Sequence, residues 1–457
     1  MTLEMENKNI LLALAVWGCA AVAGILIGST PSVSTLGYLL MIPFGLLILF
    51  KPRLGLYTMM FLIPLQNLAV FSGSSGNVTL VRVVGTVVFA AWLLRKMVLH
   101  ESFRHLFSAR IFKIAGLFVW ILLISAAWSD FDLWLTPFFS YIQLLAWTLM
   151  LIDLIDSRDR LKELILVFLA GTLFSLVFAY TEFQVNEVGQ LIYERVDGSL
   201  GDANTTASIY LFVMPFLIVF LRSDQFSRIW KAGILLIFLL LILGIGATVS
   251  RSGVVSLALL ALLQLLELQK PTSRLKYVII SLVVIILIYP LVPLDNISYR
   301  FSLLSSGDLG GRAWIYRDAI DLFTASPLIG GGLGTHVGEV VISSHNAFLS
   351  VAIALGLAGL IPFIALWVLT WFQLSRAKQE ARTRGNAEMM AYASAARIGL
   401  VIFLFFSFTM STELQRMLWL YFALGEIINR LTFETKAGAV KPSQFIYSKN
   451  MRLQSDL

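Results

Sequence analysis

Charge is the scarcest feature of this sequence. Only 13% of its 457 residues are Asp, Glu, Lys or Arg, whereas 58% are hydrophobic. Soluble domains carry about 25% charged residues, so this composition excludes water as the main solvent of the folded chain. The strict alternation of apolar and polar residues that is typical of membrane β-barrels is also missing. Each membrane-crossing segment must therefore be a helix, which satisfies its own backbone hydrogen bonds.

Cysteine is nearly absent as well. Cys19 is the only one, which excludes a disulfide framework and a cysteine metal site. It lies within an apolar run that continues to Ile27, and the preceding residues are acidic (Glu4, Glu6) as well as basic (Lys8). This pattern favours a buried thiol in a helix over a cleaved signal peptide or a lipoprotein anchor.

Long apolar runs are what the sequence has in abundance. Fourteen runs of roughly 17 to 25 residues have the length that crosses ~30 Å of hydrocarbon. They lie at about 9–28, 34–50, 54–71, 78–95, 111–128, 133–155, 161–181, 204–222, 229–249, 252–268, 275–291, 346–372, 394–410 and 414–431. The sequence thus predicts an all-α polytopic membrane protein with about 12–14 transmembrane helices and a large periplasmic loop that contains a short amphipathic helix.

We expect no separate soluble domain. Residues 1–431 are predicted to form a single transmembrane domain, in which residues 292–345 are the large periplasmic loop. Residues 432–457 are predicted to be a short cytoplasmic tail.

Basic residues gather in alternate connections between the runs, and their excess marks these connections as cytoplasmic. The set comprises Lys51, Arg53, Arg95, Lys96, Arg104, Arg110, Lys113, Arg158, Arg160, Lys162, Arg222, Arg228, Lys231, Lys270, Arg274, Lys276, Arg376, Lys378, Arg382 and Arg384. The turns near Pro31, Ser74 and Asp130 hold none. We therefore expect a multi-pass protein of a bacterial inner membrane with both termini in the cytoplasm. The net charge of +7 then reflects topology, and no nucleic-acid partner is expected.

The outer connections contain arginine but no lysine. Their cationic residues are Arg195, Arg251, Arg300, Arg312, Arg317 and Arg416, and His336 and His345 lie beside them. Arginine offers a planar fork that matches phosphate oxygens, whereas lysine is a point charge. Either these guanidinium groups bind an anion, or they are scattered and solvated.

Two outer segments, 182–203 and 292–345, are long enough to build a site. In the second, apolar side chains recur at helical spacing over 312–324, with Trp314 and Tyr316 as the aromatics expected at headgroup level. We predict a short helix at the outer interface, in which Arg317 and Asp321 are an i,i+4 pair. The glycine cluster at 330–334 indicates a tight turn and is only weak support for phosphate binding.

Three predicted helix starts carry the strongest candidates. Ser343-Ser344 should cap the next span and place His345 in its first turn, where the helix dipole favours a neutral imidazole that can act as a general base. A capping or structural histidine is the alternative. Arg251 in Ser250-Arg251-Ser252-Gly253 and Arg312 after two glycines also open helices. Helix N-termini and arginine forks together favour an anion with several oxygens, such as a lipid pyrophosphate.

Other outer residues have less definite roles. Arg195 either contacts the same substrate or pairs with a neighbouring acidic residue, and Arg317, His336 and Asn346 are further possible substrate contacts. Glu413 and Arg416 share a short outer turn and are expected to pair. HExxH, DxD, Walker and paired metal-carboxylate motifs are missing from the outer connections, so we expect no metal and no cofactor.

Two stretches, GGRAWIYRDAIDLFTASPLIGGGLGTH and SSHNAFLSVAIALGLAGL, resemble the O-antigen ligase and polymerase superfamily of bacterial membrane glycosyltransferases. SRSG at 250–253 and ERVDGSLGDANTTA are also similar to it, so that the resemblance spans about 78–425. It implies a metal-independent inverting transfer of a glycan from undecaprenyl pyrophosphate on the periplasmic side. Arg251 and Arg312 would hold the pyrophosphate, and His345 would activate the acceptor hydroxyl.

The resemblance leaves the acceptor open. Polymerases extend a surface polysaccharide (O-antigen or exopolysaccharide), ligases transfer to lipid A-core in lipopolysaccharide biosynthesis, and related enzymes modify protein. The high number of spans favours a polymerase slightly, and the lack of a large C-terminal periplasmic extension disfavours protein modification. Membrane lipids and other polysaccharide assembly proteins are the further partners expected. The rival hypothesis is a lipid-linked oligosaccharide flippase or transporter, which would need ionisable or broken helices near the midplane.

Overall fold

The computed structural model describes residues 44–66, 80–179, 183–188, 191–268, 270–288, 294–305, 312–334 and 344–434. The predicted span 9–28 and the greater part of 34–50 lie outside these residues. The same holds for His336 and for the tail after residue 434.

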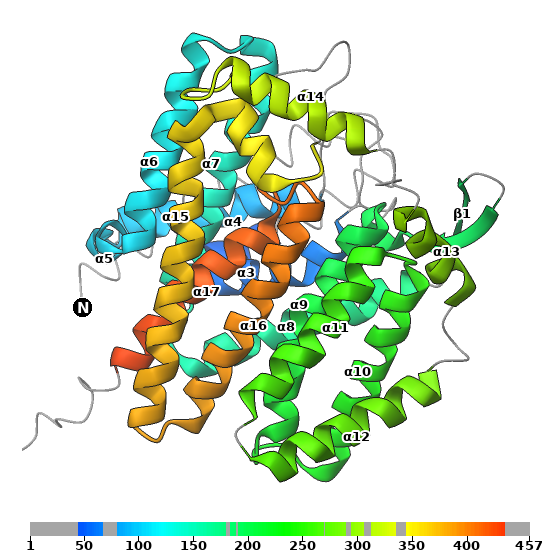
Figure 1. Ribbon diagram of the computed structural model, residues 1–457. Coiled ribbons are helices and arrows are strands. Elements are labelled where there is room, and N and C mark those ends of the chain that lie inside the picture. The colour runs from blue at the N-terminus through cyan, green and yellow to red at the C-terminus, as the bar shows by residue number, and fades with distance from the viewer. Residues whose placement is uncertain are drawn as a thin grey trace, which may run out of the picture.

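Helices account for nearly all of the described elements (Figure 1). Those of the first half are α3 (Pro52–Leu62), η1 (Ile63–Leu65), α4 (Leu80–Val98), α5 (Arg104–Ser108), α6 (Arg110–Ile124), η2 (Ser125–Ala127), α7 (Phe131–Leu154) and α8 (Arg158–Ala179). The second half has η3 (Gly198–Leu200), α9 (Ala203–Arg222), α10 (Arg228–Ala247), α11 (Arg251–Glu267), α12 (Pro271–Ile288), α13 (Leu294–Ser305), α14 (Arg312–Ala325), α15 (Ala347–Thr383), α16 (Ala387–Thr409) and α17 (Arg416–Phe433).

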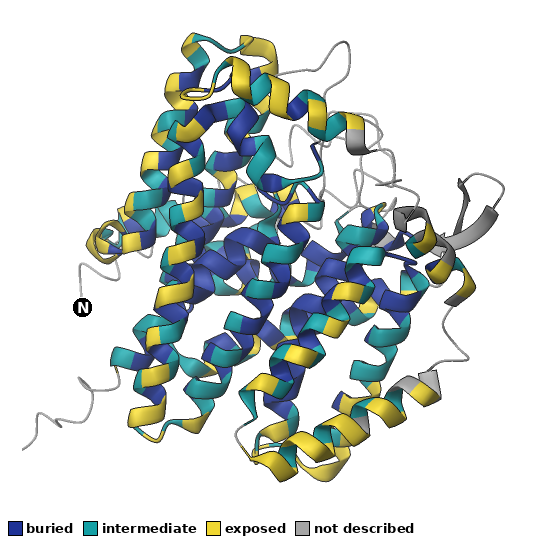
Figure 2. Ribbon diagram, viewed as in Figure 1, coloured by how far each residue is buried: buried dark blue, intermediate teal, exposed yellow. Residues whose placement is uncertain are grey.

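The helix α9 lies at the centre of the bundle. It is apolar on all sides, and such a helix is stable only when neighbours surround it. Helices α8, α10, α11 and α16 pack against it, and its residues from Thr206 to Phe220 are all buried. Figure 2 shows this buried centre in dark blue, with exposed residues on the outer helices.

The surface of the bundle is apolar where a membrane would surround it. Trp120 of α6, Phe174 of α8 and Ile286 of α12 are 63%, 53% and 69% exposed, a pattern that water would not tolerate over so many helices. Within the described residues, seven helices are long and apolar enough to cross a membrane: Arg110–Ala127, Phe131–Leu154, Arg158–Ala179, Ala203–Arg222, Arg228–Ala247, Ala347–Thr383 and Ala387–Thr409. The predicted all-α polytopic membrane fold is confirmed.

The 37-residue helix α15 is broken near its start. Gly356 has φ 58° and ψ −157°, so the helical hydrogen bonds are interrupted there. The chain at 327–332 replaces them: the N–H groups of Gly331 and Gly332 donate to the carbonyls of Ile353 and Ala354 (2.8 and 2.9 Å). In return, the Leu357 N–H donates to the Pro327 carbonyl (2.8 Å). A break at membrane depth is tolerated only when protein satisfies the freed backbone groups in this way.

This contact between the segment 327–332 and the bend of α15 explains why glycines cluster there. A Cβ at Gly330 would lie 2.4 Å from the Ala354 carbonyl carbon, and one at Gly356 would lie 2.4 Å from that of Leu328. Gly332 and Gly334 similarly face Ser129 and Leu133 at the start of α7. The predicted tight turn is thus a backbone-to-backbone joint that fixes the segment between α14 and the bend of α15.

We expect Gly356→Ala to destabilise the protein strongly. The new Cβ meets backbone on both Leu328 and Ile329, and alanine resists a positive φ. The loss should be about 3 kcal/mol or more, measured as a lower thermal midpoint in detergent. Gly116→Ala is the matched control, because it lies in α6 with nothing within 4 Å of its Cβ position. Equal midpoints for the two variants would contradict the role of the joint.

The two polar segments that are predicted to lie outside contain more regular structure than their sequences indicated. Residues 183–196 contain an antiparallel hairpin, β1 (Phe183–Val188) and β2 (Leu191–Val196), in which Gln184 is opposite Arg195. Within the segment expected to be a loop, the structure adds α13 before the predicted helix, which is present as α14. The last helix continues to Phe433, two residues past the predicted end of the transmembrane domain.

Candidate functional site

The helix α11 begins at Arg251, and its start is fastened to the start of α9. Ser250 is the N-cap: its Oγ accepts from the Gly253 N–H (3.1 Å) and donates to Oδ1 of Asn204 (2.6 Å). Asp202 caps α9 in turn by accepting from the Thr205 N–H (2.7 Å). Arg251 therefore lies beside the segment that follows the hairpin with Arg195.

Backbone strain precedes Arg251. Val249 has φ 48°, a value that a β-branched residue rarely adopts. It is 1% exposed and packs with Ile297 of α13, with Phe301 and Val254 against them. Strained residues persist only where their surroundings hold them, and they cluster at functional sites. The contact with α13 thus holds the turn that precedes Arg251.

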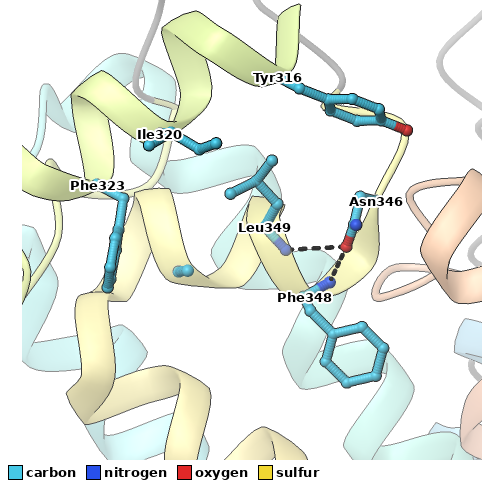
Figure 3. A pocket seen from close by; sticks show the side chains of 7 residues that line it. Tyr316, Ile320, Phe323, Asn346, Phe348 and Leu349 are labelled. Atoms are coloured by element: carbon cyan, nitrogen blue, oxygen red, sulfur yellow. Dashed lines mark hydrogen bonds between the residues drawn. The ribbon is translucent and has the colours of Figure 1, made fainter. Parts of the chain in front are cut away.

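The helix α14 begins at Arg312 and lies across the top of the molecule in Figure 1, where it packs against α15. Between the two helices is a cavity of about 440 Å³. Figure 3 shows Tyr316, Ile320 and Phe323 of α14 facing Asn346 and Leu349 from the start of α15. Arg317 of the same helix is exposed. The cavity is mostly apolar and has Tyr316 and Asn346 at its polar end.

The structure corrects the position of His345. Asn346, and not a serine, is the N-cap of α15: its Oδ1 accepts from the N–H groups of Phe348 and Leu349 (3.0 and 3.1 Å; Figure 3). An asparagine oxygen reaches both amides, whereas Ser344 is engaged elsewhere. His345 consequently precedes the cap and lies outside the first turn. It is half-buried and has φ 47°.

A serine network fixes the chain on either side of His345. The buried Ser344 donates to the Asn346 carbonyl (2.8 Å), and its Oγ lies 2.6 Å from Oγ of Ser350. Ser350 also lies 3.3 Å from Oγ of Ser411, in the turn between α16 and α17. Two segments that are distant in the sequence, the start of α15 and the turn at Ser411, therefore meet next to His345.

Glu413 also belongs to this network, a role that its sequence context did not predict. The expected pair between Glu413 and Arg416 is wrong: these two described side chains form no ion pair, and Arg416 donates to Oε1 of Gln66 instead (2.6 Å). Glu413 is 7% exposed, hydrogen-bonds with Ser350, and has one buried oxygen, Oε2, for which the described residues provide no hydrogen-bond partner. Burial raises the pKa of Glu413 from 4.5 to about 8, so the carboxyl is neutral at pH 7.

We expect Glu413→Gln to remove a pH dependence of stability. The folded pKa is raised, so the parent is most stable below pH 4.5 and loses stability until pH reaches about 8. The loss is at most about 1.4 kcal/mol for each pH unit in that window. Thermal midpoints of the parent should therefore fall between pH 5 and pH 8, while those of the glutamine variant fall less. Parallel curves would show that Glu413 is ionised in the folded protein.

The predicted residues fall into two described groups. Arg251 lies at the start of α11, beside the start of α9, whereas Arg312 and Arg317 belong to α14, which packs on the helix that follows His345 and Asn346. The backbones of Arg195 and Arg312 are described, in β2 and at the start of α14. Within the described residues, no three His, Cys, Asp or Glu side chains are placed to hold a metal ion.

The fold and these groups define a multi-pass membrane protein whose polar residues gather at the ends of broken or capped helices. Residues 236–364 match the family described as O-antigen ligase. The matched segment runs from α10 into α15, so that it contains Arg251, Arg312 and His345. No curated protein matches the chain significantly. The match supports the predicted O-antigen ligase and polymerase superfamily and, in broad terms, a glycosyl-transferring enzyme.

Proposed function

We propose that the protein is a periplasmic-face glycosyltransferase that moves a glycan from undecaprenyl pyrophosphate to an acceptor hydroxyl. The observation that carries the proposal is the coincidence of the family match with the helix starts at Arg251 and Arg312 and the strained His345. The acceptor is a further repeat unit for a surface-polysaccharide polymerase or lipid A-core for an O-antigen ligase.

In the proposed reaction, the acceptor oxygen attacks the anomeric carbon as the bond from that carbon to the pyrophosphate oxygen breaks. His345 takes the hydroxyl proton, and the sugar configuration inverts. Undecaprenyl pyrophosphate leaves with the bonding electron pair. Arg251 and Arg312 stabilise the negative charge that develops on it, which is where fixed cations accelerate such a step. The step needs no metal in this scheme.

A transfer assay with the purified protein tests the proposal. An undecaprenyl-pyrophosphate glycan is offered with repeat units or with lipid A-core, in the presence of EDTA, and the products are separated by mass. We expect a glycan joined to one acceptor and free undecaprenyl pyrophosphate. Movement of the intact donor across proteoliposomes, without a new glycosidic bond, would establish the flippase alternative and reject the transferase.

Thiol labelling tests the proposed topology. In a Cys19→Ser background, Leu414→Cys lies in the turn before α17 and Thr383→Cys is the last residue of α15, in the connection that precedes α16, and both positions are exposed. We expect a membrane-impermeant maleimide to label position 414 in intact spheroplasts and position 383 only after lysis. The reverse pattern would place the site on the cytoplasmic side.

A further inference from the structure

A second cavity, of about 940 Å³, lies at the other end of the bundle from α14. It is enclosed by the ends of α9 and α11, the C-terminal half of α15 and the start of α16. These are the ends whose connections carry the excess of lysine and arginine, which is typical of the cytoplasmic side. The volume is within the ~300–1,000 Å³ range of small-molecule sites.

Two polar groups that line this cavity have no hydrogen-bond partner among the described residues. Gln264 of α11 is 3% exposed and Tyr392 of α16 is 2% exposed. Both line the cavity, and no hydrogen bond engages the Gln264 amide or the Tyr392 hydroxyl within the described part of the chain. Nearly buried polar groups are normally hydrogen-bonded, so these two indicate a polar occupant.

Basic side chains line the cavity as well. Four basic and three acidic residues line the cavity: Lys162, Arg222, Lys378 and Arg382, and Asp224, Glu267 and Glu388. Lys378 pairs with Glu267, so that three basic and two acidic residues remain. Lys162 is held in place, because its Nζ donates to Oε1 of Gln225 (2.7 Å) and lies 4.8 Å from the centre of the Phe226 ring.

One wall of the cavity is apolar. It is lined by Pro215, Ile218 and Val219 of α9 and by Ala391 and Ala395 of α16. A free anion would gain nothing from such a wall, whereas a lipid could place its acyl chain there and its phosphate among the basic residues. Basic pockets between transmembrane helices on the cytoplasmic side bind anionic lipid headgroups in this manner.

We propose that this cavity binds the phosphate headgroup of an anionic phospholipid from the cytoplasmic leaflet. Arg222 and Arg382 contact the phosphate, and Gln264 and Tyr392 bind the oxygens behind it. The site is separate from the proposed transfer reaction and does not depend on it.

Native mass spectrometry of the full chain in detergent tests this site, with phosphatidylglycerol and phosphatidylethanolamine of the same acyl chains and with inorganic phosphate as probes. We expect one retained phosphatidylglycerol. Arg222→Gln combined with Arg382→Gln should weaken its binding more than about tenfold. Lys276→Gln is the matched control, since Lys276 is exposed on α12 and does not line the cavity. Ala391→Trp should block the site sterically.

Thermal midpoints equal to that of the parent establish that these variants fold. Unchanged phosphatidylglycerol binding by the double arginine variant would overturn the proposal. So would equal retention of phosphatidylethanolamine. Inorganic phosphate that binds as tightly as the lipid and is lost in the same variants would identify a free-phosphate site and reject the lipid.

Discussion

We expect His345→Asn to lower the rate of glycan transfer by about 10²- to 10⁴-fold, the usual contribution of a general base. Asparagine tolerates the left-handed backbone that His345 adopts at φ 47°. The substitution therefore removes the imidazole and leaves the turn before α15 in place. The measurement is the initial rate of undecaprenyl pyrophosphate release at saturating donor and acceptor.

His100→Asn provides the matched control. His100 also has a positive φ, 52°, and lies exposed in a connection predicted to be cytoplasmic. Its variant should transfer glycan at the parent rate. If both asparagine variants are fully active, His345 does not act as the base, and its strained backbone has only a structural role.

We expect Arg251→Gln to weaken donor binding by about ten- to a hundredfold. Hydrogen bonds to charged groups contribute about 1.5–3 kcal/mol, and glutamine has neither the charge nor the fork. Arg251→Lys should recover only part of the loss, because lysine restores the charge without the paired N–H groups. The measurement is the KM for the lipid-linked donor at a fixed acceptor concentration.

Arg228→Gln is the control for Arg251. Both arginines are the first residue of a helix that follows a serine, in α10 and α11 respectively. They are predicted to lie on opposite sides of the membrane, so Arg228→Gln should leave the KM for the donor unchanged. Equal losses in the two variants would assign the effect to helix starts in general and not to a site.

The elements that could be predicted from the sequence are those that depend on neighbouring residues along the chain. Apolar runs of spanning length predicted the bundle, and the spacing over 312–324 predicted α14. The Ser250-Arg251 sequence likewise predicted where α11 begins, since a serine oxygen can cap the helix directly after it.

Other features depend on contacts that no local pattern contains. The break at Gly356 is stable only because residues 327–332 supply its hydrogen bonds, and Ser350 meets Glu413 only after α15 and α17 pack together. Two missed features did have local signals. The alternation on both sides of Gly189-Gln190 is typical of a hairpin, and asparagine is as good an N-cap as serine, which favoured Asn346 directly before the apolar run.

In the proposed reaction, arginines bind the pyrophosphate and a histidine takes the proton. This assignment of roles is tested most directly by the Kd for undecaprenyl pyrophosphate itself, measured with the purified parent, Arg251→Gln and His345→Asn proteins. The account predicts that Arg251→Gln binds it at least about tenfold more weakly, whereas His345→Asn, although much slower in transfer, binds it as the parent does. Parent-like binding by Arg251→Gln would contradict the account.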